Sequence, residues 1–121
     1  HSMAHGLSAL YDTPHGVACA ILLPVGLEDN KSVAGERYRA VGMAMSVKGI
    51  DEMNDAQAAD ATIAAVKQLS ADVGIPTNLQ GILKEEDIQF LAESAYADAC
   101  RPGNPRDTSV EEIVELYKSQ L

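Results

Sequence analysis

The stretch from Gly16 to Gly26 constrains the fold most, because it is apolar almost all the way round a helix. A helix with that pattern is buried on every side, so the rest of the chain has to pack around it. The apolar run Val17–Val25 is about half as long as a membrane span requires, and no basic stretch precedes it as in a signal peptide. We therefore expect this segment to be the central helix of a soluble, cytoplasmic domain.

Turn and capping signals divide the rest of the chain into further helical segments, and no alternating pattern long enough for a strand remains. Residues 2–10 fit a short helix or turn, after which Asp12 or Thr13 can cap the central helix with Pro14 in its first turn. Further helices are expected over residues 33–45, 54–73, 84–99 and 109–117. The apolar stripe of the 54–73 helix extends to Leu69 and Val73. The sequence thus predicts an all-α domain of five or six packed helices.

Length and composition agree with one helical packing unit. The chain has 121 residues, of which 46% are apolar and only 4% aromatic, so the core must be built from Ala, Val, Ile and Leu. The net charge of −9 repels phosphate backbones and anionic lipids, which argues against nucleic acid and membrane partners. The two cysteines, Cys19 and Cys100, form neither a CxxC pair nor a disulfide framework.

All three histidines, His1, His5 and His15, lie within the first fifteen residues. On a helix, His1 and His5 project from one face, and His15 lies where the chain turns back toward that face, so the three could form a metal site. The alternative is that His1 belongs to a cloning remnant and that the other two are ordinary surface and helix-start residues. A zinc protease is excluded, because Ser2 stands where the H-E-x-x-H motif needs its general-base Glu.

The spacing of these histidines is similar to a family signature. His1-x-x-x-His5, followed ten residues later by Pro14-His15-Gly16 and then by Leu22-Leu23-Pro24, resembles the metal-binding segment of the iron-dependent (group III) alcohol dehydrogenases. The stretches 73–76, 104–106 and 112–117 look like the lactaldehyde reductase and 1,3-propanediol dehydrogenase branch of that family. The sequence departs from the family pattern at Cys19, where Asn is common, and at Val25, where His is common.

The resemblance implies a fragment of a larger enzyme. Family members are two-domain enzymes about three times as long, and no Gly-rich dinucleotide fingerprint is present in residues 1–121. The chain therefore resembles only the latter part of the C-terminal helical, metal-binding domain, with the N-terminal dinucleotide-binding domain absent. The resemblance implies an NAD(P)-dependent dehydrogenase that acts on small alcohols or diols. We expect the fragment to be inactive alone.

The resemblance also implies roles for individual residues. His1 and His15 match two ligands of a divalent ion, usually Fe²⁺ and sometimes Zn²⁺, whose other ligands are an Asp and a His upstream in the family. His5 matches a histidine beside the nicotinamide and the substrate, where an imidazole can relay the alcohol proton or only orient its neighbours. Cys100 matches a residue facing the substrate entrance, so it is a candidate cofactor contact; the alternative is an ordinary buried thiol.

The resemblance also implies partners. We expect a small alcohol or aldehyde substrate, contact with the missing N-terminal domain, and a homo-oligomer, because the interdomain surfaces would otherwise expose apolar area. A competing hypothesis is a stand-alone helical interaction module that derives from such an enzyme and binds partners through that surface.

Overall fold

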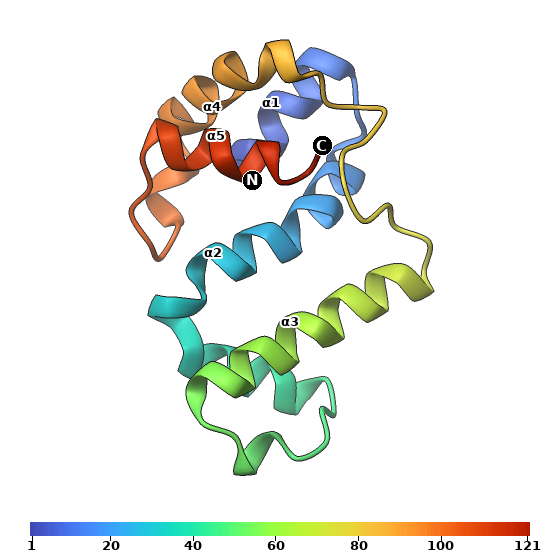
Figure 1. The fold of residues 1–121 in the computed structure, drawn as a ribbon, viewed down its shortest axis with the longest axis vertical. Helices are drawn as coiled ribbons and strands as arrows, with labels where there is room; N and C mark the ends of the chain where they lie inside the picture. The colour runs from blue at the N-terminus through green and yellow to red at the C-terminus, as the bar shows by residue number, and fades with distance from the viewer.

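Five α-helices and three single-turn 3₁₀ helices make up the computed structural model, which describes residues 1–121. The structure contains no strand, as the sequence predicted (Figure 1). In chain order the elements are α1 (Ser2–Tyr11), α2 (His15–Ala44), η1 (Ile50–Glu52), α3 (Asp55–Asp72), η2 (Glu85–Asp87), α4 (Ile88–Ala97), η3 (Arg101–Gly103) and α5 (Val110–Lys118). None of the helices combines the length and apolar character that crossing a membrane requires.

The α1–α2 turn differs in its capping from the sequence prediction. Neither Asp12 nor Thr13 caps α2; the capping position is Pro14, whose side chain makes no cap hydrogen bond. Asp12 instead ends α1 in the left-handed conformation, with φ 55°, and Thr13 is buried. Asp tolerates that conformation better than most residues, so it serves as the helix stop. This tight turn places His15 at the first position of α2, beside α1.

Helix α2 merges two segments that the sequence predicted as separate helices, 16–26 and 33–45. Gly26 keeps a negative φ and does not end the helix; the break in helical geometry is a kink at Ala34, with φ −135° and ψ 18°. Its first half is also not buried on every side, because the Leu23 side chain is 50% exposed. Packing on two different neighbours, α1 and then α3, keeps the whole segment helical.

Helix α3 runs back alongside α2, as Figure 1 shows, so that Lys67 near its end pairs with Glu28 in the first half of α2. It begins with the predicted capping box, in which Asn54 accepts from the Gln57 backbone and Gln57 from that of Asn54, and it ends before Gly74, at φ 83°. Only the first half of its apolar stripe is buried: Leu69 and Val73 are 55% and 66% exposed. The helix forms where the apolar stripe predicted it, but the C-terminal part of that stripe is exposed to solvent.

The main core lies among α1, α4, α5 and the first half of α2. Buried residues from the centre of α4 meet the predicted face of α5, whose Ser109–Glu112 capping box is also present. The buried Tyr117 hydroxyl donates to the Met3 carbonyl at 2.7 Å, which ties the end of the chain to its beginning. This hydrogen bond fixes α1, and hence the histidines it carries, against the core.

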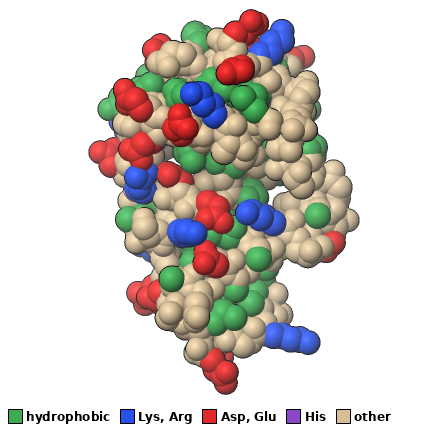
Figure 2. All heavy atoms as spheres, viewed as in Figure 1, with side chains coloured by type: hydrophobic (Ala, Val, Ile, Leu, Met, Phe, Trp, Pro, Cys, Tyr) green, Lys and Arg blue, Asp and Glu red, His purple; other side chains and the backbone are tan.

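The surface carries interspersed charges on the face that Figure 2 displays, where acidic and basic side chains lie between apolar ones. Several large apolar side chains are at least 40% exposed; they include Leu10, Leu23, Val33, Val41, Met43, Leu69, Val73, Phe90 and Tyr96.

Candidate functional site

The fold brings all three histidines together. His1 and His5 lie one turn apart at the start of α1, and His15 begins α2. Their ring centroids are 6.1 Å apart for His1 and His5, 5.6 Å for His1 and His15, and 5.5 Å for His5 and His15. The tight turn at 12–14 creates this cluster, because it folds the first turn of α2 back against the first turn of α1.

One side of the cluster offers nitrogen and sulfur donors. The ligand atoms of His1, His15 and Cys19 all lie within 4.8 Å of one another. Cys19 stands one helical turn after His15, with Sγ 3.5 Å from His15 Nε2. Imidazole nitrogen and thiol sulfur are donors that Fe²⁺, Zn²⁺ and similar divalent ions accept. The donor set therefore fits a partial coordination shell for such an ion.

The other side of the cluster is a hydrogen-bonded chain through Asp98. His5 Nδ1 lies 2.8 Å from Asp98 Oδ2, and Asp98 Oδ1 accepts from the backbone N–H of Cys100 at 2.8 Å. The Cys100 N–H, and then His5, lower the pKa of Asp98 below its ordinary value. An ionised Asp98 holds the His5 ring in one orientation and directs its Nε2 away from the carboxylate.

Three hollows border the cluster at His1 or His5, and His15 lines none of these three. His1 lines two of them, of about 360 and 450 Å³, and His5 lines a third of about 380 Å³. Cys100 borders the 360 Å³ hollow and is exposed, so it is not the ordinary buried thiol that was one of the two expectations. Hollows of this size accept small organic molecules, and each is open to solvent.

Polar contacts hold the Cys100 loop against α2. The side chains of Asn30 and Asn104 exchange two hydrogen bonds, of 2.7 and 3.0 Å. Arg106 pairs with Asp29 at 3.2 Å and also with Glu112, which lowers the pKa of Glu112 mainly through that side-chain hydrogen bond. These contacts give Asn30 and the 104–106 segment a physical role: they fix the loop that carries Asp98 and Cys100.

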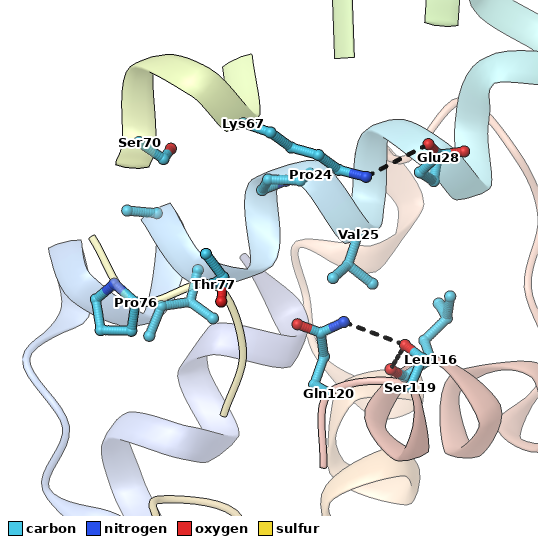
Figure 3. Close-up of a pocket in the computed structure, with 12 residues that line it drawn as sticks. Pro24, Val25, Glu28, Lys67, Ser70, Pro76, Thr77, Leu116, Ser119 and Gln120 are labelled. Atoms are coloured by element: carbon cyan, nitrogen blue, oxygen red, sulfur yellow. Dashed lines mark hydrogen bonds and ion pairs between the residues drawn. The ribbon is translucent and has the colours of Figure 1, made fainter. Parts of the chain in front are cut away.

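A separate groove of about 390 Å³ lies on another side of α2. Figure 3 shows Val25 of α2 on the side of Gln120, and Lys67 of α3 passing beside Pro24 toward Glu28, which it approaches to 3.8 Å. None of the three histidines lines this groove. It therefore does not belong to the histidine cluster.

Sequence reasoning found part of this arrangement and missed part of it. It predicted that His1, His5 and His15 share one region, and the structure brings them together. It missed Asp98, because no local signal links it to His5 across 93 residues. It treated Cys19 only as a departure from the family pattern, although the four-residue spacing from His15 places both on one helix face.

Comparison with known proteins is consistent along the whole chain. The sequence matches the family model described as "Fe-containing alcohol dehydrogenase family, C-terminal" over residues 1–121. It is 48% identical to lactaldehyde reductase of Escherichia coli K12 over 118 residues, and 39% identical to 1,3-propanediol dehydrogenase of Citrobacter freundii over 119. Those alignments cover 97% and 98% of this chain but 31% and 30% of the relatives. The chain thus spans about a third of their length.

Solved structures agree with the sequence relatives. The crystal structure of a 1,3-propanediol oxidoreductase matches this chain with a TM-score of 0.95 at 37% identity. The match covers all of this chain and 32% of the oxidoreductase chain. An alcohol dehydrogenase from Oenococcus oeni matches this chain with a TM-score of 0.94 at 40% identity. That match also covers all of this chain and 32% of the dehydrogenase chain. The chain belongs to the iron-containing alcohol dehydrogenase family, and its five helices correspond to the C-terminal helical part of that family's fold.

Proposed function

We propose that this chain is the C-terminal helical part of a metal-dependent, NAD(P)-dependent alcohol dehydrogenase or aldehyde reductase. Its substrates would be small alcohols, diols or the matching aldehydes, of the lactaldehyde and propanediol kind named for its relatives. The observation that carries the proposal is the convergence of three imidazoles from α1 and α2 at one point. The upstream two-thirds found in the relatives would supply the dinucleotide site.

His1 and His15 would hold the divalent ion, Fe²⁺ or Zn²⁺, from this side of the site. Both imidazoles are exposed, so they are free to turn toward an ion between this domain and a covering domain. When bound, the ion would supply electrostatic stabilisation of negative charge on the substrate oxygen.

His5 would bind and move the alcohol proton. Asp98 accepts a hydrogen bond from Nδ1 of His5, which leaves Nε2 as the atom that faces a substrate hydroxyl or carbonyl. Asp98 in this role is a positioning residue, since it acts through His5. Cys100, anchored by the same carboxylate, would line the entrance and contact the cofactor or the substrate.

The small volume of the hollows supports small substrates. Hollows of about 360 to 450 Å³ around His1 and His5 are at the lower end of ligand-site sizes, before a second domain narrows them further. The Cys100 loop forms much of the lining of the 360 Å³ hollow. A two- to four-carbon alcohol fits such a space.

A chimera tests the proposal. The N-terminal part of Escherichia coli lactaldehyde reductase would be joined to this chain in place of its own C-terminal third, which is 48% identical. We expect the chimera to contain a bound divalent metal and to oxidise NAD(P)H with small aldehydes, whereas the 121-residue chain alone shows no turnover. A folded, metal-replete chimera without activity would favour the interaction-module alternative.

His15→Ala in the chimera tests the ligand assignment. Removing one imidazole should lower metal content and activity together, because each ligand contributes to holding the ion. Circular dichroism and thermal unfolding check that the variant folds. Full metal content in the folded variant would contradict the role of His15.

A further inference from the structure

We infer that Cys19 is a third metal donor on this domain, so that the site of this chain is a His–His–Cys group. This inference rests on the proposed metal site and goes beyond it, because it concerns a residue to which the proposed function gives no role. Cys19 would bind as the thiolate, with its proton released to solvent.

The distance between the two donors on α2 suits a shared ion. A tetrahedral ion with metal–sulfur and metal–nitrogen bonds of about 2.3 and 2.05 Å places its sulfur and nitrogen ligands about 3.6 Å apart. Cys19 Sγ and His15 Nε2 are 3.5 Å apart. The four-residue spacing along α2 therefore already sets one edge of a coordination tetrahedron.

His1 completes the group from α1. Its ligand atom lies within 4.8 Å of both others, at most about 1.5 Å farther than a shared ion requires, and its side chain is exposed. A rotation of that exposed side chain closes the gap without moving the backbone. Cys19 is the fixed member of the group, because it is partly buried and packs against the main core.

The surroundings favour a ligand over a bystander thiol. Cys19 and His1 line the same 450 Å³ hollow, whose other walls include the apolar Leu22, Leu23 and Leu27. The polar contact of the thiol in the structure is with the His15 ring. A thiolate there also changes metal preference, because soft sulfur favours Zn²⁺ and Co²⁺ over Mg²⁺ and Mn²⁺ more than an amide does.

Cobalt spectroscopy of the 121-residue chain tests the inference, because a thiolate bound to Co²⁺ gives a near-ultraviolet charge-transfer band that imidazoles do not give. We expect this band in the wild type and in Cys100→Ser, and its loss in Cys19→Asn. Zn²⁺ affinity should fall at least about tenfold in Cys19→Asn. Mutating a residue that only hydrogen-bonds to a metal ligand already lowers affinity by about that factor, and the loss of a ligand should lower it at least as much. Bound Zn²⁺ should also protect Cys19, and not Cys100, from alkylation.

Other results would overturn the inference in recognisable ways. Visible cobalt bands without the charge-transfer band mean that the imidazoles bind the ion alone; the proposed function then stands and the Cys19 ligand fails. The role of Cys19 as a ligand is also contradicted if the charge-transfer band survives in Cys19→Asn. If the band disappears only in Cys100→Ser, the thiolate ligand belongs to the His5–Asp98–Cys100 group instead. Absence of any cobalt binding by the folded wild-type chain contradicts the three-donor group of this chain, whereas the metal content of the chimera decides the proposed function.

Discussion

His5 differs from the two neighbouring histidines because its ring is hydrogen-bonded to a carboxylate, that of Asp98. His1 and His15 are exposed and lie with a thiol, whereas His5 contacts an acidic side chain that is itself anchored to the backbone of Cys100. A carboxylate behind one nitrogen orients the other, which suits proton transfer as well as ligation. Three chemically identical residues thus have different expected roles because of what stands behind each ring.

His5→Ala in the chimera should keep near-normal metal content but lower turnover, by about 10²- to 10⁴-fold if His5 relays the proton. Asp98→Asn should lower turnover less, by about 10- to 100-fold, and alter the pH profile, because Asn still accepts a hydrogen bond from His5 but carries no charge. Metal analysis and kcat measured across pH check both variants. Loss of metal from His5→Ala to the same extent as from His15→Ala would make His5 a ligand.

Glu112 provides a pH test of the contacts that hold the Cys100 loop. Arg106 lowers the pKa of Glu112 in the folded chain, so this pair stabilises the fold above the ordinary carboxyl pKa and stops doing so as pH falls through the lowered value. Glu112→Gln keeps the capping box, because Gln serves at that position, but removes the charge. We expect the variant to unfold in less urea than the wild type at pH 7. The difference should shrink as pH falls from the ordinary carboxyl pKa through the lowered pKa of Glu112. A difference that stays undiminished once Glu112 is protonated would contradict the electrostatic origin.

At the scale of elements, the α2–α3 pair depends on close approach at one glycine. A Cβ at the buried Gly42 would overlap the side chains of Ile50 and Thr62. The Thr62 hydroxyl in turn lies 2.8 Å from the Tyr38 carbonyl of α2 and from the Ala58 carbonyl of its own helix, and shares its one hydrogen between them. This hydrogen bond across the helix pair requires the short separation that Gly42 permits.

Gly42→Ala should therefore destabilise the fold by about 1–3 kcal/mol, the range for overpacking a close contact. Gly26→Ala is the matched control on the same helix, because a Cβ there meets nothing within 4 Å and φ is not positive. That change should stabilise the fold by about 0.5–1 kcal/mol, since alanine loses less entropy than glycine in a helix. Urea unfolding of both variants measures the difference, and equal effects would contradict the packing argument.

At the scale of the whole molecule, burial is uneven. A core of thirteen buried residues lies among α1, α2, α4, α5 and the segment that carries Leu79 and Leu83, while the α2–α3 pair buries only a cluster of three. The far end of α3 exposes Leu69 and Val73, and α2 exposes Leu23. Apolar side chains exposed along one helix favour association with another protein surface.

We therefore expect the 121-residue chain to self-associate at high concentration, and expect Leu69→Gln combined with Val73→Gln to weaken that association. Both positions are more than half exposed, so the change should leave the stability within about 0.5 kcal/mol. Sedimentation velocity across a concentration series measures the effect, with circular dichroism as the folding check. A wild-type chain that stays monomeric at the highest concentration would contradict the expectation.

The sequence by itself determined the features that depend on neighbours a few residues away. The capping boxes at Asn54 and Ser109, the glycine stop at Gly74, the all-helical content and the four-residue spacing of His1 and His5 are local, so they could be predicted from the chain. Packing between distant segments decided the rest. It kept α2 helical through Gly26, left the distal stripe of α3 in solvent, and placed Asp98 beside His5, because each outcome depends on which surfaces meet and not on local propensity.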